Sequence, residues 1–147
     1  MVKDAYSKKK NKELVTITKA RIDEYDRQRT STLAGKSQAR LDPWQQDALD
    51  VLNRGNHLVI DAPTTSGKTR VVEEYFANNI HNPNFRVCYT CPVKSLSNDK
   101  LQEFRHLFGH EYVGIATGER KENLDAPIVI ATLETYRNSL IGIEPDL

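Results

Sequence analysis

Short apolar runs alternate with amphipathic stretches from residue 43 onwards. Four apolar runs have the length and composition of strands and lie at residues 57–61, 85–90, 112–116 and 128–131. Around them, apolar side chains recur at helical spacing in residues 43–54, 70–80, 95–108 and 133–140. Strands that alternate with helices at this spacing form crossover units, which build parallel sheets. The pattern therefore predicts an α/β fold in which helices cover both faces of a parallel sheet.

Polar or small residues follow each predicted strand directly, namely Asp61-Ala62, Thr90-Cys91-Pro92, Thr117-Gly118 and Thr132. The carboxyl ends of parallel strands meet at one edge of a sheet, and open α/β sheets bind their ligands there. Thr132 is also a good N-cap for the helix that follows it. We therefore expect the functional site to lie at that edge of the sheet.

Charge is distributed unevenly along the chain. Residues 1–40 contain eleven Lys or Arg against five Asp or Glu, whereas residues 41–147 contain ten against fifteen. We therefore predict a basic, polar arm or linker over 1–40, which could be helical over 13–29, ahead of a globular part over 41–147. Within the arm, Lys8-Lys9-Lys10 could contact nucleic-acid phosphate or simply be solvated.

Composition narrows the class of protein. The sequence has no run of about 18 apolar residues and no signal-peptide pattern, so we expect a cytoplasmic protein without a membrane partner. The two cysteines, Cys88 and Cys91, lie on one predicted strand, where residues three apart point to opposite faces. Since no second pair of ligands accompanies them, they predict two buried free thiols rather than a zinc site or a disulfide.

The stretch between the first predicted strand and the next helix predicts a phosphate-binding loop. It runs Ala62-Pro63-Thr64-Thr65-Ser66-Gly67-Lys68-Thr69. A loop that closes onto a helix start directs free N–H groups and partial positive charge at one point, and Gly67 allows close backbone approach. Lys68 can reach the β- and γ-phosphates of ATP, and the Thr69 hydroxyl can ligate Mg²⁺. These two would be the catalytic residues; the alternative is an ordinary exposed turn with a solvated lysine.

Residues 41–140 resemble the first RecA-like domain of the superfamily-two helicases, and among these the superkiller-type DExH RNA helicases. Leu41-Asp42-Pro43-Trp44-Gln45-Gln46-Asp47-Ala48-Leu49 is similar to the family's Q-type motif, in which Gln45 falls on the glutamine that recognises adenine. The loop at 62–69 is similar to Ala-Pro-Thr-Ser-x-Gly-Lys-Thr, so alanine is accepted at its first position. The resemblance implies ATP binding by Gln45 and by residues 62–69, in a P-loop NTPase (RecA-like) fold.

The remaining matches resemble motifs that contact the nucleic-acid backbone. Residues 89–100 are similar to motif Ia, Thr117-Gly118-Glu119 to a Thr-Gly-Asp motif, and residues 130–140 to Val-Met-Thr-Thr-Glu-x-Leu-Arg-x-x-Leu. The resemblance implies that a single strand of RNA or DNA contacts seven residues, which are Pro92, Lys94, Ser95, Thr117, Gly118, Thr132 and Arg137.

The resemblance also implies elements that are not in this sequence. The family's acidic box, Asp-Glu-x-His, and its second RecA-like domain would follow Leu147. The segment Asp23-Glu24-Tyr25-Asp26 has a similar composition, but it precedes the loop at 62–69 and lies on no apolar strand, so it predicts an exposed helix turn. We therefore expect an incomplete domain, a fragment of an ATP-dependent RNA helicase with little or no turnover alone. The alternatives are a DNA helicase or translocase and a non-catalytic nucleotide- or nucleic-acid-binding module.

Overall fold

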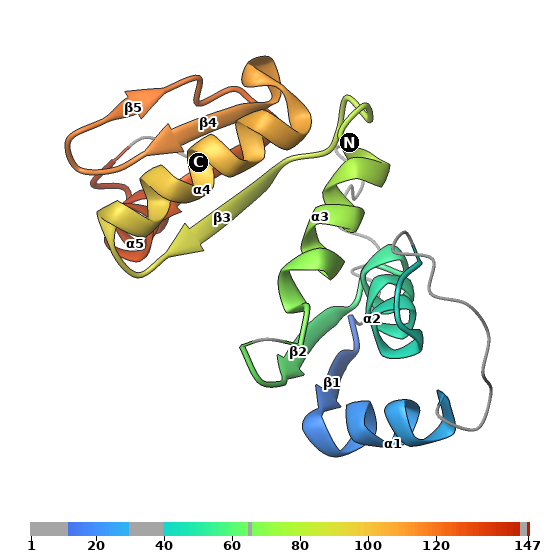
Figure 1. The fold of residues 1–147 in the computed structure, drawn as a ribbon. Coiled ribbons are helices and arrows are strands. Elements are labelled where there is room, and N and C mark those ends of the chain that lie inside the picture. The colour runs from blue at the N-terminus through green and yellow to red at the C-terminus, as the bar shows by residue number, and fades with distance from the viewer. Residues whose placement is uncertain (1–11, 30–39, 65, 145–146) are drawn as a thin grey trace, which may run out of the picture. The chain divides into compact units, whose positions relative to one another are not determined.

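The computed structural model describes residues 12–29, 40–64, 66–144 and 147. The chain divides into two compact units, Met1–Phe76 and Ala77–Leu147, and each unit has its own sheet (Figure 1). Parallel pairing dominates both sheets, and helices alternate with strands along the chain, which confirms the predicted α/β class. The division of the strands between two sheets was not predicted.

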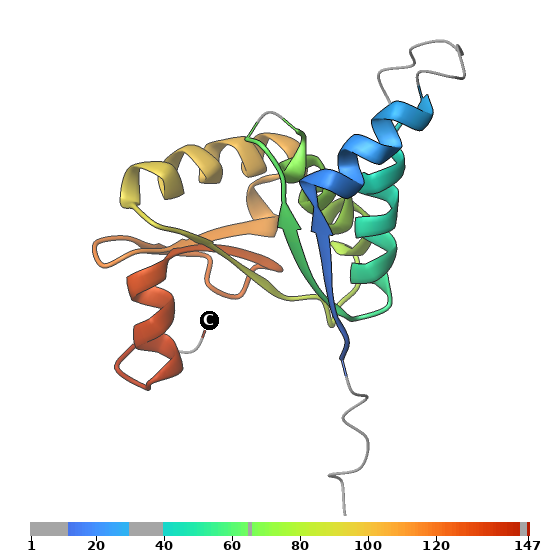
Figure 2. The ribbon, with the colours of Figure 1, turned by 90° about the horizontal axis from the view of Figure 1, so that it is seen from below.

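The first unit contains two parallel strands, β1 (Leu14–Thr18) and β2 (His57–Asp61), which lie side by side in Figures 1 and 2. Helix α1 (Lys19–Arg29) follows β1, and α2 (Pro43–Asn53) precedes β2. Helix α3 (Lys68–Asn79) begins after β2, and its last residues belong to the second unit. Because β1 and β2 are parallel, the start of α1 and the loop after β2 lie at the same edge of this sheet.

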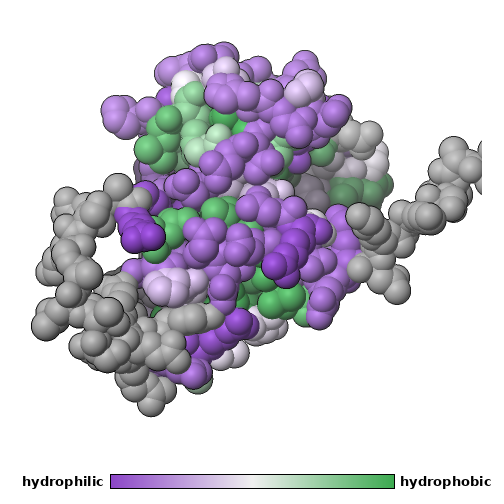
Figure 3. All heavy atoms as spheres, turned by 90° about the vertical axis from the view of Figure 1, so that its right-hand side faces the viewer, coloured by the Kyte–Doolittle hydropathy of each residue, from purple (hydrophilic) through white to green (hydrophobic). Residues whose placement is uncertain are grey.

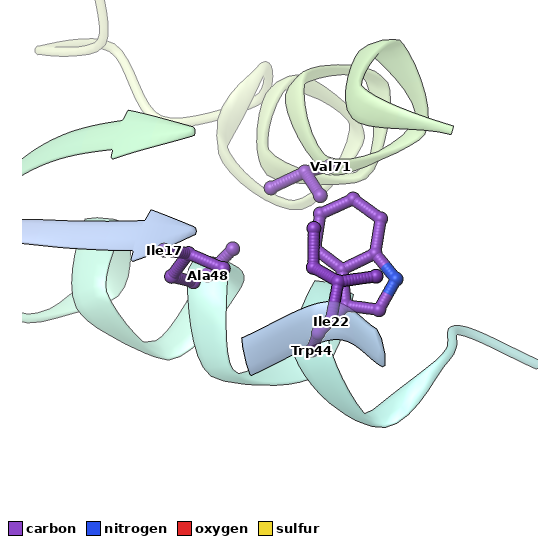
Figure 4. Packing of buried hydrophobic residues seen from close by; sticks show 5 residues of the cluster. All are labelled: Ile17, Ile22, Trp44, Ala48 and Val71. Carbon is purple, nitrogen blue, oxygen red and sulfur yellow. The ribbon is translucent and has the colours of Figure 1, made fainter. Parts of the chain in front are cut away.

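A hydrophobic core joins these elements. Ile17 from β1, Ile22 from α1, Trp44 and Ala48 from α2, and Val71 from α3 are all buried and converge in Figure 4. Burying a side chain such as Ile17 contributes roughly 1.5–3 kcal/mol. Two of these five side chains come from residues 12–29, so part of the basic segment belongs to the core of the first unit.

The prediction of a helix over residues 13–29 was wrong for its first part. Residues 14–18 form β1, and the helix begins only at Lys19. The sequence Leu-Val-Thr-Ile-Thr contains four β-branched residues, which favour strands, and pairing with β2 satisfies its backbone groups. Asp23 and Glu24 lie exposed on α1, as predicted for the acidic segment.

The second unit contains a four-stranded sheet in the order β3-β6-β4-β5. Its strands are β3 (Val87–Cys91), β6 (Ile128–Thr132), β4 (Val113–Ala116) and the short antiparallel β5 (Lys121–Glu122). Every residue of β4 and β6 is buried, as expected for parallel strands covered on both faces. Helices α4 (Lys94–Phe108) and α5 (Leu133–Leu140) lie on opposite sides of this sheet in Figure 2, and a short 3-10 helix, η1 (His110–Tyr112), leads into β4.

Gly114 allows the segment after β4 to fold back against that strand. A Cβ atom at this position would lie 2.1 Å from the carbonyl oxygen of Asn123, which is far inside the contact distance. Only glycine therefore permits the β4–β5 hairpin to close. The predicted polar loop over 117–126 contains β5, the second strand of this hairpin, so part of it is regular structure.

The face of the molecule drawn in Figure 3 is largely polar. In the face drawn in Figure 3, hydrophobic side chains are exposed in separate groups among hydrophilic ones. No helix in the described residues is both long and apolar enough to span a membrane. Both cysteines are free thiols, as predicted, although only Cys91 is fully buried; Cys88 is half-buried, and its burial raises its pKa to about 11.

Removing core volume from β1 tests whether this strand stabilises the first unit. Ile17→Ala should lower the free energy of unfolding by about 2–5 kcal/mol, because it leaves a cavity in the core cluster that contains Trp44. Trp44 is the single tryptophan, so its fluorescence in a urea titration reports on this unit. Leu14→Ala is the matched control, since Leu14 lies on the same strand and is 65% exposed. Equal urea midpoints for the two variants would show that β1 does not pack as described.

Candidate functional site

The predicted phosphate-binding loop joins β2 to α3 in the first unit. Ala62, its first residue, packs against the hydrophobic core, which gives its methyl group a partner that glycine would lack. Gly67 has a left-handed backbone with φ of +85°, which favours glycine. The helix begins at Lys68, so the N–H groups of its first turn face the loop. Pro63 and Thr64 are exposed, and Thr65 lies outside the described residues.

Gln45 connects the start of α2 to this loop. Its side-chain Nε2 donates to the Gly67 carbonyl oxygen at 3.0 Å, and its Oε1 accepts from the Asp42 N–H at 2.8 Å. Gln45 is only 6% exposed, so both bonds form away from bulk water. A Cβ atom on Gly67 would lie 2.7 Å from Nε2, so the contact also requires glycine at position 67. Sequence reasoning had assigned Gln45 to adenine alone.

The polar side chains of the loop bond to its own backbone. Lys68 Nζ donates to the Ala62 carbonyl oxygen at 2.7 Å, and Ser66 Oγ donates to the Pro63 carbonyl oxygen at 2.6 Å. The Lys68 ammonium thus already points back across the loop, where a phosphate oxygen could replace the carbonyl as its acceptor. Thr69 lies half-buried in the first turn of α3, next to Lys68. This donor set fits a polyphosphate, and a single hydroxyl ligand suits Mg²⁺, which keeps several waters.

In the second unit, the parallel register brings the predicted nucleic-acid contacts to one edge. Cys91 pairs with Thr132, and Ala116 pairs with Ala131, so β3, β4 and β6 end together. The segments beginning at Pro92, Thr117 and Thr132 therefore leave the sheet at the same edge. This arrangement confirms, for the second sheet, the expectation that polar residues gather at the carboxyl ends of the strands.

Lys94 is held at this edge by an acidic neighbour. Its Nζ lies 2.5 Å from Glu119 Oε1, and both side chains are largely exposed. The hydrogen bond from Lys94, together with its positive charge, holds the pKa of the Glu119 carboxyl below its usual range. An exposed pair of this kind contributes little to stability, so a phosphate can replace Glu119 at small cost. Pro92 and Ser95 are exposed on either side of Lys94.

The side chains of the two threonines at this edge accept hydrogen bonds from the protein backbone. Thr117 Oγ1 accepts from the Arg120 N–H at 3.0 Å, and Thr132 Oγ1 accepts from the Thr135 N–H at 3.3 Å, which caps α5 as predicted. Both threonines are buried, so what they present to a ligand is ordered backbone rather than a free hydroxyl. Gly118 and Arg137 are exposed.

A charged network in the turn after Thr117 was not predicted from the sequence. The carboxylate of Glu122 accepts from Arg120 at 2.7 and 3.0 Å and from Arg105 at 3.2 Å. These contacts, those to Arg120 first, hold the pKa of Glu122 below its usual range. The available signal was the pair of opposite charges at Arg120 and Glu122, since residues two apart in an extended segment share a face.

A family model and several known proteins match most of this chain. A family model described as DEAD/DEAH box helicase matches residues 42–144. The chain is 44% identical to the chloroplastic DExH-box ATP-dependent RNA helicase DExH15 of Arabidopsis thaliana over 69% of this chain and 8% of that protein. It is 37% identical to the antiviral helicase SKI2 of Saccharomyces cerevisiae over 68% of this chain and 8% of that protein.

A bacterial relative gives a similar match. The probable helicase HelY of Mycobacterium tuberculosis (strain ATCC 25618 / H37Rv) is 37% identical over 73% of this chain and 12% of its own length. The chain thus spans between 8% and 12% of the length of these three relatives.

Replacing Gln45 tests the bridge between α2 and the loop. Gln45→Glu keeps an acceptor for the Asp42 N–H but places a carboxylate oxygen against the Gly67 carbonyl oxygen. We expect the free energy of unfolding of the first unit to fall by about 1–3 kcal/mol, measured by Trp44 fluorescence in urea. Gln46→Ala, on the exposed side of the same helix, should stay within about 0.5 kcal/mol of the parent chain. Equal losses of unfolding free energy in the two variants would show that the Gln45–Gly67 hydrogen bond does not stabilise this unit.

Proposed function

Since this chain belongs to the DEAD/DEAH box helicase family, we propose that it is the ATP-binding part of a larger ATP-dependent helicase that acts on RNA. The observation that carries this proposal is the loop at 62–69, which closes onto the start of α3 and is tied to α2 by Gln45. The aligned strand ends of the second unit support a nucleic-acid contact. RNA is favoured because the Arabidopsis relative DExH15 is named an RNA helicase.

The loop would bind the phosphates of ATP through charge and backbone N–H groups. Lys68 exchanges the Ala62 carbonyl oxygen for β- and γ-phosphate oxygens, and the first turn of α3 adds N–H donors at its positive end. Thr69 would ligate Mg²⁺, which supplies charge neutralisation between the phosphates when it is bound. Ser66 and Pro63 keep the loop in shape through their hydrogen bond.

Gln45 can recognise adenine without leaving the loop. An amide side chain has two N–H donors and two lone pairs on its oxygen. In this structure one bond from Nε2 goes to Gly67 and one bond to Oε1 comes from Asp42. One donor and one acceptor position therefore remain on the same amide for the edge of an adenine ring. Adenine binding at Gln45 and phosphate binding at the loop would then be coupled through the Gly67 carbonyl.

The edge of the second unit would bind the backbone of a single strand. Lys94 supplies positive charge once phosphate displaces Glu119, and Ser95 lies in the first turn of α4. Pro92, Thr117, Gly118 and Thr132 shape the edge, and exposed Arg137 lies on α5. Contacts of this kind position a strand without reading its bases. Strand separation would further require a second RecA-like domain, which we propose as the partner of this one.

ATP titration in the presence of Mg²⁺ tests the loop. We expect calorimetry to show binding to the parent chain and a loss of roughly tenfold or more in Lys68→Ala, because the variant lacks the charged donor to the phosphates. Lys100→Ala is the matched control, since it removes a lysine paired with Glu103 on α4 and should leave ATP affinity unchanged. We expect little or no hydrolysis, because phosphoryl transfer requires more charge stabilisation than Lys68 and Thr69 supply. Turnover that Lys68→Ala abolishes would contradict this last expectation.

Competition between matched strands tests the choice of RNA over DNA. Unlabelled RNA should displace a labelled RNA strand at lower concentration than DNA of the same sequence if 2′-hydroxyl groups contribute. Fluorescence anisotropy measures both displacements. Lys94→Ala should weaken binding of RNA and DNA by the same factor, because a phosphate contact does not distinguish the sugars. Equal competition by the two strands would favour a translocase that accepts DNA.

A further inference from the structure

A cavity of about 520 Å³ lies in the second unit, alongside α4. We call it the arginine pocket. It is lined by residues of α4, η1 and the segment before β5, namely Leu101, Gln102, Arg105, His106, His110 and Arg120. Its volume is within the roughly 300–1,000 Å³ typical of small-ligand sites. Two arginines and two histidines in one cavity are a donor set suited to an anion.

The two guanidinium groups are held in place by one carboxylate. Glu122 accepts from Nε and Nη2 of Arg120 and from Nη2 of Arg105. Arg120 Nη1 also donates to Asn98 Oδ1 at 3.3 Å, and Arg105 Nε donates to the Val113 carbonyl oxygen at 3.3 Å. Two positive charges share one negative charge, so the cluster of three side chains keeps a net charge of +1. Ordered, partly neutralised guanidinium groups lose little conformational entropy when they bind a phosphate.

The pocket is connected to the edge that carries the nucleic-acid contacts. The Thr117 N–H donates to the Arg120 carbonyl oxygen at 2.8 Å, and the Arg120 N–H donates back to Thr117 Oγ1. Gly118 lies within this tight turn, and Arg120 closes it. A strand that contacts Thr117 and Gly118 would therefore meet Arg120 next.

We propose that the arginine pocket binds a phosphate group through Arg105 and Arg120, and that this group is a phosphodiester of the bound strand. The choice of a strand over a free nucleotide rests on the proposed function and on the turn that joins Thr117 to Arg120. The pocket then extends the path of the strand from the sheet edge along α4. His106 and His110, both exposed in the cavity, add hydrogen-bond donors beside the guanidinium groups.

Binding of single-stranded RNA to Arg120→Gln tests the proposal, measured by fluorescence anisotropy at several salt concentrations. We expect roughly tenfold weaker binding, and a slope of log affinity against log salt that is smaller by about 0.7, the value for one phosphate of a single strand. Arg86→Gln is the matched control, because Arg86 is exposed at the other end of β3, outside the pocket, and donates to the Leu124 carbonyl oxygen. Circular dichroism confirms that both variants are folded.

A second experiment distinguishes a phosphodiester of the strand from the phosphate of a free nucleotide. Inorganic pyrophosphate is titrated into Lys68→Ala and into the double variant Lys68→Ala/Arg120→Gln, so that the loop at 62–69 does not contribute. Pyrophosphate binding that needs Arg120, with RNA binding that does not, would overturn the strand assignment in favour of a free nucleotide. If Arg120→Gln weakens neither RNA binding nor pyrophosphate binding, the arginine pocket does not bind phosphate.

The outcomes also separate this inference from the proposed function. If Lys94→Ala weakens RNA binding and Arg120→Gln does not, the nucleic-acid edge stands and the strand assignment falls. If the parent chain binds no RNA, the proposed function and the strand assignment fail together, and the pyrophosphate arm alone decides whether the pocket is a phosphate site.

Discussion

The hydrogen bond from Gln45 to the Gly67 carbonyl oxygen ties the start of α2 to the phosphate-binding loop, and the geometry of the first unit depends on it. The same buried amide accepts from the Asp42 N–H, so one side chain both closes the start of the helix and fixes the loop. Gly67 must lack a Cβ atom for this approach. In the proposed function, a base that bonds to Gln45 would therefore act on the backbone of the loop, and base recognition would be coupled to phosphate binding by direct contact.

The second unit relies on strand register instead of a single bond. Because β3, β4 and β6 pair in parallel, they end at the same level of the sheet. The segments that follow them therefore share one edge of the sheet. The charges at this edge are held in exposed pairs, such as that of Lys94 with Glu119. Pairs of this kind keep the basic side chains ordered at little cost in stability, and phosphate can replace the carboxylate. In the proposed function, this edge would remain largely neutral until a strand binds.

The basic N-terminal segment contributes structure as well as charge. Its strand β1 pairs with β2, and Ile17 and Ile22 belong to the core cluster that contains Trp44. An exposed ion pair between Arg21 and Asp47, at 3.2 Å, adds a contact between α1 and α2. The strand that leads into the phosphate-binding loop therefore has a hydrogen-bonded neighbour, which reduces the freedom of its backbone. The position of the loop depends in part on residues that precede the helicase motifs.

The sequence by itself determined the elements and their chemistry, because helical and strand periodicity, an N-cap such as Thr132 and the glycine at 67 are local signals. It predicted the loop at 62–69 for the same reason, and it predicted one edge for four strands, of which β3, β4 and β6 share an edge while β2 lies in the other sheet. Tertiary structure alone decided the rest. Residues 14–18 became a strand because β2 offers them hydrogen-bond partners, and Gln45 reached Gly67 because packing of α2 brings together positions 22 residues apart. The arginine pocket likewise unites α4 with the β5 hairpin, a proximity that no local pattern encodes.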